Sequence, residues 1–457
     1  MEIDSRVFSD QKIGRLLIKF GIPTILSLLV MELYNMIDTI FVGSTIGSVG
    51  IGALTISLPI QKLINSTGLM MAVGTSTAVS RNLGKKKFHK VTKVILNSLI
   101  LTSLILSLLC IIIFIFRNYI IKNLLGASEN LFIYAYQYIS IILLGGIFQC
   151  LTLVIGYIIM SLGDTKLTLK ATSLGAIINM ILDLILVVHF SMGVKGAAIA
   201  TTVSQILAFI YTFKKFIKIK QQINLEFKFI FELSIIKSII TVGFSTFIVE
   251  VSDGLLSIVF NNLLSVNGGD DAIVIIGTIT KLSMFLFITV IGISSAMQPI
   301  VAFNYGDKNY QRLKLVIKET IIFITITTLI VWGSMFLFLS YLMGIFLKDT
   351  ELLIKAVKAF RIVIMIFPCV GIYYVSIYCC QAFGKAKSSF ILSIYRETLV
   401  CIPAAIILVY KLGTIGAWLA YPVADFISCI TGLFYIRKII NNLKKLINNK
   451  ASSKYII

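Results

Sequence analysis

Apolar runs of twenty or more residues recur along the whole chain, and short polar segments separate them. The runs at 94–116, 139–159 and 320–339 are each long enough to cross a hydrocarbon core of about 30 Å as a helix. The pattern predicts spans at residues 16–43, 51–80, 93–116, 131–160, 167–190, 194–216, 235–265, 272–303, 316–341, 357–383, 389–411 and 415–436. The sequence therefore predicts an all-α membrane protein with twelve transmembrane helices.

The composition supports this fold class. Of the 457 residues, 58% are hydrophobic and only 13% are charged, whereas an ordinary soluble domain is about 25% charged. The net charge of +21 suggests nucleic-acid binding at first sight. The basic residues, however, lie in short clusters between apolar runs, without an aromatic platform or a recognition helix. We therefore expect the lipid bilayer as a partner, and no nucleic acid.

Neither the cysteines nor short motifs indicate an enzyme. The seven cysteines all lie inside apolar runs, and none has metal-ligand spacing with histidine, so we interpret them as small buried hydrophobic residues and expect no cofactor. No HExxH, GxSxG or GxxxxGK[S/T] motif occurs on the spans. An intramembrane enzyme is therefore an unfavoured alternative to a transporter. A channel is another, because the chain has no filter-like loop.

The basic residues define a topology. Of the 41 lysines and arginines, 31 lie in the N-terminus, the even-numbered loops and the C-terminal tail, nine lie in the odd-numbered loops, and Lys281 lies within a span. Cytoplasmic loops carry the excess of lysine and arginine. We therefore expect both termini on the cytoplasmic side of the plasma (inner) membrane of a bacterium, which requires an even number of spans.

The second half of the chain repeats the first. Three pairs of loop motifs recur in the same order at offsets of 220 to 222: 82–86 with 304–308, 161–166 with 382–387, and 195–200 with 415–420. Six helices per copy is an even number, so both copies insert in the same orientation. We expect a pseudo-two-fold axis along the membrane normal, with a substrate cavity between two lobes. The predicted parts are a cytoplasmic segment (1–15), an N-lobe (16–220), a linker (221–234), a C-lobe (235–437) and a basic tail (438–457).

Ionisable residues inside spans are candidates for function, because a charge at a helix centre costs about 2.5–3.5 kcal/mol on insertion. The candidates are Glu32, Asp38, Asp183, Glu250, Asp253, Lys281, Arg396, Glu397 and Asp425. Arg396 and Glu397 lie near a cytoplasmic end, where an interfacial position would explain them.

Asp38 and Asp183 are distinguished by their neighbours. Asn35 shares a helix face with Asp38, and Asn179 shares one with Asp183. The topology places Asp38, Asp183 and Thr201 at a common depth of roughly 8–14 Å from the external surface. Two carboxylates, an amide and a hydroxyl suit either Na⁺ or a proton held between acids. The alternative is that these groups only hydrogen-bond helices together.

The repeat favours a functional role for this cluster. At the repeat offsets Asp38 corresponds to Phe260, Asn179 to Leu399, Asp183 to Pro403 and Thr201 to Tyr421, so the polar set occurs in one lobe only. General helix packing would not require that asymmetry. In the second lobe, Glu250 and Asp253 share a helix face and Lys281 is an expected ion-pair partner; this group is either a second acidic site or a structural one.

These motifs resemble the multidrug and toxic compound extrusion (MATE) family, in its bacterial branch. The most specific are Tyr34-Asn-Met-Ile-Asp-Thr-Ile-Phe-Val-Gly43 and Met297-Gln-Pro-Ile-Val-Ala-Phe-Asn-Tyr-Gly306, with the Asn179–Asp183 pair and Gly196-Ala-Ala-Ile-Ala-Thr201 in addition. The resemblance covers essentially the whole chain. It implies two six-helix lobes around a central cavity, and export of cationic or amphipathic drugs by antiport with H⁺ or Na⁺.

The resemblance also assigns residues. It implies that Asp38, Asn179, Asp183 and Thr201 form the N-lobe cation site, and that the first helix bends at Pro23. Part of the family has an acidic residue in span ten as a partner for the glutamate of span seven, but residues 357–383 contain none, which weakens a site built on Glu250. A lipid-linked saccharide flippase of the same wider superfamily is the nearest rival. We expect a protein that functions as a monomer.

The topology is testable by labelling single cysteines in intact cells. Cysteines placed in 85–93, in 214–220 or in the C-terminal tail should resist an impermeant reagent added outside, because these segments hold the dense lysine and arginine clusters. A cysteine replacing Lys122, in an odd-numbered loop, is the control and should react. Labelling of the first group from outside would overturn the topology.

Overall fold

The protein was analysed as a computed structural model, which describes residues 6–222, 232–347 and 349–452. Regular structure in these residues is helical. The helices are α1 (Arg6–Asp10), α2 (Ile13–Ile46), α3 (Ser48–Gly84), α4 (Phe88–Tyr119), α5 (Glu129–Ser161), α6 (Lys166–Asp183), α7 (Gly193–Gln222), α8 (Leu233–Gly306), α9 (Tyr310–Phe346), α10 (Thr350–Val363), α11 (Val370–Ala382), α12 (Ala386–Ile394), α13 (Ile402–Leu412) and α14 (Thr414–Ser452). The predicted all-α fold class is confirmed. The linker expected at 221–234 lies largely outside the described residues.

Each predicted span has a helical counterpart. Eleven helical segments within the described residues are long and apolar enough to cross a membrane. α8 supplies two of them, because its backbone breaks at Gly269, where φ is 63°. The second predicted span is not one of these eleven segments. It corresponds to α3, which is 37 residues long but carries many hydroxyl side chains. Its Thr75, Ser76, Thr77 and Ser80 are buried inside the protein, so this polar face is not presented to lipid.

The chain forms two compact units. Unit 1 contains the described residues of Met1–Val7 and Leu26–Phe247, and unit 2 contains those of Phe8–Ile25 and Ile248–Ile457. Both boundaries fall inside helices, one within α2 and one within α8. Residues 26 and 248 differ by 222, which is an offset of the internal repeat. The first part of α2 therefore belongs to unit 2, and the first part of α8 belongs to unit 1.

The backbone preserves the duplication as well. Residues with positive φ recur in pairs at offsets of 220 to 222: Gly47 with Gly269, Lys86 with Lys308, Gly163 with Gly384, and Gly193 with Gly413. Each pair marks a turn between two helices, so both halves reverse direction at equivalent positions.

A buried polar pair is duplicated in the same way. In unit 1 the hydroxyl groups of Ser76 and Ser161 are 2.8 Å apart. In unit 2 the amide of Gln298, which corresponds to Ser76, donates at 3.0 Å to the side-chain oxygen of Gln381, one residue before the position that corresponds to Ser161. These hydrogen bonds satisfy buried polar atoms between helices. Equivalent helices are therefore joined in both units, although the residue types differ.

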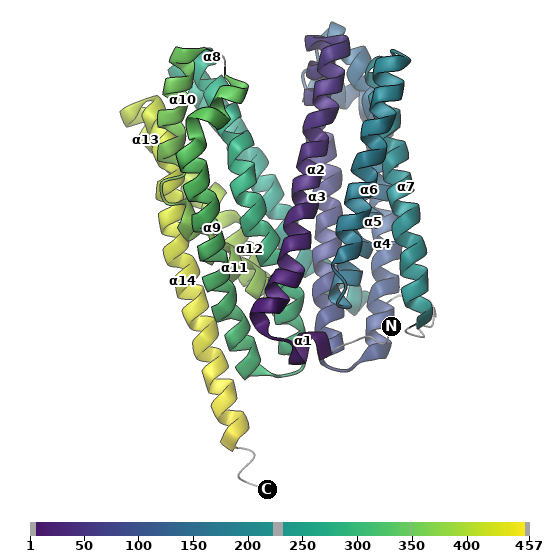
Figure 1. The fold of residues 1–457 in the computed structure, drawn as a ribbon, viewed down its shortest axis with the longest axis vertical. Helices are drawn as coiled ribbons and strands as arrows, with labels where there is room; N and C mark the ends of the chain where they lie inside the picture. Colours follow the sequence, from purple (N-terminus) through teal and green to yellow (C-terminus); the bar gives the residue numbers. More distant parts are fainter. Residues whose placement is uncertain (1–5, 223–231, 348, 453–457) are drawn as a thin grey trace. The chain divides into compact units, whose positions relative to one another are not determined.

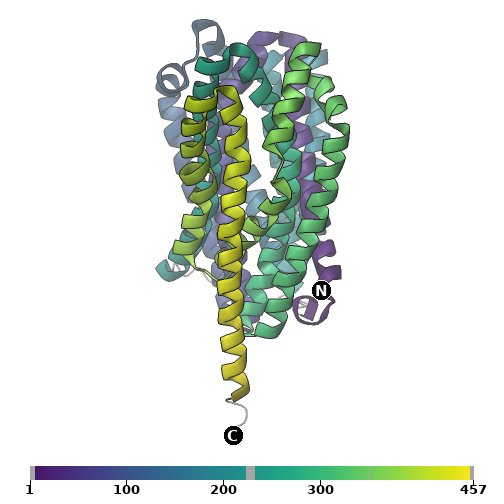
Figure 2. The ribbon, with the colours of Figure 1, turned by 90° about the vertical axis from the view of Figure 1, so that its left-hand side faces the viewer.

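Within unit 1, α5 lies at the centre and packs against α3, α4 and α7, while α6 packs against α7 (Figure 1). Within unit 2, α14 packs against α10, α11 and α13 (Figure 1). Figure 2 shows α14 as one long helix. It runs well beyond the predicted end at residue 436, because Ile436, Ile439 and Leu443 form a buried stripe at helical spacing.

Two departures from the predicted spans have local causes. The tenth helix begins at Thr350 rather than at 357, because the Asp349 carboxylate caps it by accepting from the backbone N–H of Glu351 at 2.8 Å and of Leu352 at 3.1 Å. The same span is broken at residues 364–366, before the turn that contains Pro368, because proline cannot donate a backbone hydrogen bond.

Small residues allow α3 and the first part of α8 to approach closely within unit 1. A Cβ atom at Gly74 would lie 2.1 Å from the carbonyl oxygen of Ile239, and one at Gly243 would lie 1.9 Å from that of Met70. Both obstacles are backbone atoms, which cannot rotate away. The two helices therefore depend on glycine at these positions, as closely packed transmembrane helices generally do.

Replacement of Gly243 by alanine should destabilise unit 1 by about 1–3 kcal/mol, the usual cost of overpacking. Thermal unfolding of the purified protein in one fixed detergent measures this as a lower Tm. Gly254→Ala is the matched control on the same helix, since a Cβ there meets no atom within 4 Å; it should leave Tm unchanged or raise it. Equal melting of the two variants would contradict the close approach.

Candidate functional site

The structure brings the four predicted cation-site residues together in unit 1. Asp38 lies on α2, Asn179 and Asp183 lie on α6, and Thr201 lies on α7. Their exposed fractions are 7%, 0%, 0% and 5%, so the side chains point into the protein rather than toward lipid. Asp38 and Asp183 are close enough to interact electrostatically.

The Asn179 amide connects the other members of this group. In one orientation its nitrogen donates to Thr201 Oγ1 at 3.4 Å. Turned by half a rotation, the nitrogen donates to Asp183 Oδ2 at 2.8 Å and the oxygen accepts from the backbone N–H of Thr201 at 3.2 Å. We prefer the second orientation, because both amide atoms then have partners at shorter distances.

Two tyrosines complete the cluster. The Tyr34 hydroxyl donates to Thr201 Oγ1 at 3.3 Å, and the Tyr138 hydroxyl hydrogen-bonds the carboxyl group of Asp38. Tyr138 is 2% exposed and comes from α5. Four helices therefore supply oxygen or nitrogen atoms to one buried site, which we call the unit 1 acidic site (Tyr34, Asp38, Tyr138, Asn179, Asp183 and Thr201).

Each carboxyl group keeps one oxygen without a hydrogen-bond partner. Among the described residues, neither Oδ1 of Asp38 nor Oδ1 of Asp183 is hydrogen-bonded, and no lysine, arginine or histidine pairs with either acid. A buried carboxylate with no counter-charge is strongly disfavoured. The chemistry of the site therefore calls for a positive ligand at these oxygens.

The donor set fits a proton or a monovalent cation better than a multivalent metal. No group of three or more histidine, cysteine, aspartate or glutamate residues with metal-binding geometry occurs in the described part of the chain. Two carboxylates, an amide oxygen and hydroxyl groups are hard oxygen donors, which suit Na⁺. The same carboxyl oxygens can instead take a proton.

The backbone beside Asp183 is unusual. Asp183 ends α6 and is followed by a π-helical turn, Leu184–His189. Such turns shift the register of a helix and are frequent at functional sites. A Cβ at Gly196 would lie 3.1 Å from the Leu186 carbonyl oxygen, so the glycine lets α7 pack against this turn. That contact gives a physical reason for the small residues of the 196–201 motif.

Sequence reasoning placed one neighbour wrongly and missed two. Asn35, expected on the same face as Asp38, is exposed. Tyr34, four residues before Asp38, is half-buried and hydrogen-bonds Thr201 instead, and its i, i+4 spacing was a usable signal. Tyr138 is a hundred residues away in the chain and has no local signal.

Among the residues of unit 2 that the structure describes, the positions equivalent to the unit 1 acidic site carry different side chains. The positions corresponding to Asp38 and Thr201 hold Phe260 and Tyr421, whose ring centroids are 4.8 Å apart. This aromatic contact takes the place of the polar contact between α2 and α7. The asymmetry expected from the repeat is therefore present in side-chain packing.

The three residues of the predicted second-lobe group all lie on α8. Glu250 and Asp253 are half-buried on α8, whereas Lys281 is exposed. The ammonium of Lys281 lies 5.9 Å from the centroid of the Phe346 ring, so this lysine has an aromatic contact. Its ion pair with Glu250 or Asp253 stays a prediction.

Pro23 lies inside α2, which continues through it as a helix. The boundary between the units falls three residues later, at Leu26. Proline lacks the N–H that would bond the fourth residue back, so α2 has a weakened hydrogen-bond ladder close to the point where it passes from unit 2 to unit 1. A bend at this proline stays a prediction.

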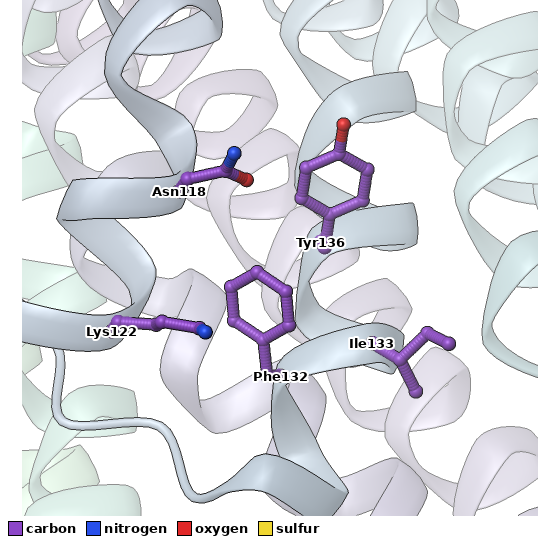
Figure 3. A pocket seen from close by; sticks show the side chains of 5 residues that line it. All are labelled: Asn118, Lys122, Phe132, Ile133 and Tyr136. Atoms are coloured by element: carbon purple, nitrogen blue, oxygen red, sulfur yellow. The ribbon is translucent and has the colours of Figure 1, made fainter.

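A hollow of about 410 Å³ lies elsewhere in unit 1 (Figure 3). Its lining residues come from the end of α4, the π-helical turn Ile120–Leu124 that follows it and the start of α5: Asn118, Lys122, Phe132, Ile133 and Tyr136. In Figure 3 the Lys122 ammonium points toward the Phe132 ring, and its nitrogen lies 4.8 Å from the ring centroid. None of the predicted site residues lines this hollow.

Comparison with known proteins decides the family. The MatE family model matches residues 23–185 and again 246–407, so the model matches twice, once in each half of the chain. The chain belongs to the MatE family. The resemblance found in the sequence is thereby confirmed, and with it the assignment as a multi-pass membrane transporter rather than an enzyme.

Curated relatives cover nearly the whole chain. It is 25% identical over 431 residues to the multidrug export protein MepA of Staphylococcus saprophyticus, and 22% identical over 430 residues to MepA of Staphylococcus aureus. Both alignments span 94% of this chain and 94% of the relative. The similarity therefore extends through both halves.

Solved structures show the same fold. A MATE crystal structure in complex with MaL6 has a TM-score of 0.91 at 22% identity, covering 96% of this chain and 99% of the other. An outward-facing multidrug resistance MATE family transporter of the MOP superfamily also has a TM-score of 0.91 at 22% identity, with 96% and 98% coverage. At this level of identity the likeness establishes the MATE fold of the chain.

Thr201→Val should weaken the unit 1 acidic site without changing side-chain volume. It removes the hydroxyl that accepts from Tyr34 and should cost about 0.5–1.5 kcal/mol, measured as a lower Tm. Thr212→Val is the matched control on α7, because that buried hydroxyl bonds only the Ala208 carbonyl of its own helix at 2.8 Å. Equal effects of both variants would show that the Thr201 hydroxyl adds nothing specific.

Proposed function

We propose that the protein is a secondary active multidrug exporter. It moves cationic or amphipathic small molecules out of the cell by antiport with H⁺ or Na⁺, through a central cavity, by alternating access. The names of the curated relatives support the substrate class, since they are multidrug export proteins along nearly their full length. The ion coupling is supported by the chemistry of the unit 1 acidic site.

One observation supports the coupling site most strongly. Asp38 and Asp183 are buried together, each with a carboxyl oxygen that lacks a hydrogen-bond partner among the described residues. Two such acids in low-dielectric surroundings favour a bound cation over two free negative charges. When the cation leaves on one side of the membrane, the carboxylates regain their negative charge. The occupied and empty states of the site then differ in free energy, and this difference can be coupled to transport.

The Asn179 amide suits an exchangeable ligand. Its nitrogen can donate to Asp183 when the carboxylate is ionised, and its oxygen can accept from the same group when it is protonated. The surrounding hydrogen bonds therefore have a favourable arrangement in both states. We propose that Asp38, Asn179, Asp183 and Thr201 hold the coupling ion, H⁺ or Na⁺.

Pro23 connects this site to movement in the proposal. It lies fifteen residues before Asp38 on α2. A helix interrupted at proline can have straight and bent forms that differ little in free energy. An ion that binds one form about a hundredfold better shifts that balance by about 2.7 kcal/mol. We propose that occupancy near Asp38 biases a bend at Pro23.

The remaining assignments complete the proposal. The protein lies in the plasma membrane of a bacterium with both termini cytoplasmic, acts as a monomer, and is divided into an N-lobe at 16–220 and a C-lobe at 235–437. The dense lysine and arginine clusters of the even-numbered loops support this orientation.

Asp183→Asn tests the coupling site in inverted membrane vesicles, with ethidium, a planar cationic dye, added to the outer medium and its uptake into the vesicles measured. The change keeps the volume and a hydrogen-bonding group but removes the charge that binds the ion. The proton gradient and the Na⁺ gradient are imposed separately. Whichever gradient drives dye movement by the wild type, the rate of dye movement by Asp183→Asn should fall to that of vesicles without the protein.

Asp164→Asn is the control. Asp164 lies in a loop of the same unit, where its carboxylate accepts from the backbone N–H of Lys166 at 2.9 Å, a bond that asparagine can also make. It should transport normally. Near-normal transport by well-expressed Asp183→Asn would remove the support for the unit 1 site. The gradient that drives wild-type transport identifies the ion.

A further inference from the structure

The hollow of Figure 3 is separate from the unit 1 acidic site, and the proposed transport mechanism does not use it. Asn118 and Lys122 lie one helical turn apart on one wall, where α4 passes into the π-helical turn that follows it. The facing wall is formed by α5, with Phe132, Ile133 and Tyr136. We call this space, of about 410 Å³, the α4–α5 hollow.

The α4–α5 hollow lies at the end of a membrane span. α4 and its π-helical turn belong to one candidate span, Phe88–Leu124. The last turns of α4 expose large apolar side chains, with exposed fractions of 46% for Phe114, 66% for Ile115 and 56% for Phe116. In a membrane such side chains face lipid. The hollow follows them directly along the helix, so it lies at the depth of the lipid headgroups, where aromatic and basic side chains are enriched.

The walls of the hollow carry hydrogen-bond donors. The Tyr136 hydroxyl accepts from Arg117 Nη2 at 2.5 Å, so its own hydrogen is available to a ligand. The same arginine donates from Nη1 to the Phe114 carbonyl at 2.6 Å, and its guanidinium lies 4.6 Å from the centroid of the Tyr136 ring. Arg117 thereby fixes the tyrosine in place. The amide of Asn118 and the ammonium of Lys122 are further donors.

The cations at this hollow differ from the buried arginine of unit 2. Arg396 lies 2.8 Å from an oxygen of Asp425 and 3.4 Å from one of Glu397. All three are less than a tenth exposed, so the interfacial position expected for Arg396 and Glu397 is wrong. In the described part of the chain, neither Arg117 nor Lys122 forms an ion pair with a carboxylate. Their charges can therefore attract an anion from outside the protein.

A phosphate diester fits these groups. Its oxygens accept hydrogen bonds and donate none, which matches the donors on the walls, and lysine is a common phosphate ligand. The volume lies within the range of small-molecule sites. Leu124 and Ile133, 67% and 56% exposed, add apolar surface that a free phosphate ion would not use but acyl chains would. We propose that the α4–α5 hollow binds the headgroup of an anionic phospholipid, with its phosphate at Lys122, Asn118 and Tyr136.

The internal repeat indicates that this site is specific to unit 1. At the repeat offsets of 221 and 222, Lys122 corresponds to Met343 and Gly344. Neither residue carries a charge. The equivalent pair of helices in unit 2 is therefore connected without a basic residue at this point, so the need to join α4 to α5 does not account for Lys122.

Native mass spectrometry of the purified full-length protein tests this inference without measuring transport. Phosphatidylglycerol is titrated, and phosphatidylcholine, which has the phosphate but no net charge, is titrated in parallel. The wild type should bind its first phosphatidylglycerol about fivefold or more tightly than phosphatidylcholine; equal binding would contradict the proposal. Inorganic phosphate should not compete, because it makes no apolar contact. Competition would show that a free anion rather than a lipid is bound.

Lys122→Gln should weaken the binding of phosphatidylglycerol about fivefold, the effect of one lysine on an anionic lipid. Tyr136→Phe, which keeps the ring, should weaken it as well. Lys411→Gln is the matched control, since that exposed lysine ends α13 and lies at another odd-numbered loop, on the same predicted side of the membrane. It should bind lipid as the wild type does. Equal affinities of the two lysine variants would show only a general attraction of anionic lipid to a basic protein, and the inference would be wrong.

Discussion

Buried negative charge is the constraint on which the account of this protein depends. A carboxylate inside a bundle of membrane-spanning helices has no water to solvate it, so it needs a cationic side chain, a proton or a metal cation. The two units meet this requirement differently. In the described part of the chain, Asp38 and Asp183 have hydroxyl and amide partners, whereas Glu397 and Asp425 both contact the Arg396 guanidinium. Among the described residues, Asp38 and Asp183 have no cationic side chain as a partner, and this deficit is the physical basis of the proposed affinity of the unit 1 acidic site for a cation.

Duplication explains why the two units share one architecture while their buried side chains differ. The repeated turns, the repeated unit boundaries and the paired polar contacts Ser76–Ser161 and Gln298–Gln381 show that the two halves share a backbone plan. Function has diverged within that plan. Where unit 1 places Asp38 and Thr201, unit 2 places an aromatic contact. In unit 1, Asp183 directly precedes a π-helical turn, and in unit 2, Glu397 lies within one; such turns shift side chains from the regular helical register.

Much of the fold could be predicted because a helix that crosses the bilayer must be long and apolar. Long apolar runs predicted the twelve spans, and recurring loop motifs predicted the duplication. Helix ends were less predictable, since α14 continues on a buried stripe of Ile436, Ile439 and Leu443 that lies past its apolar run. The break near Pro368 was missed for a related reason, because hydropathy alone does not register a local change in backbone hydrogen bonding.

Only part of the candidate site could be predicted from the sequence. Asp38, Asn179, Asp183 and Thr201 were found because polar residues in spans are rare. Tyr138 was not, because a tyrosine in an apolar run gives no sign of which helix it faces. The burial of Arg396 was also unpredictable, since its direction depends on a π-helical turn rather than on regular helical periodicity.

The central claim is that Asp38 and Asp183 hold a cation that leaves when the drug binds. Its most direct test is the release of H⁺ or Na⁺ on addition of ethidium to purified protein. We predict release by this protein, and none after Asp38→Asn and Asp183→Asn are added. Undiminished release by the latter, with ethidium still bound, would contradict the account.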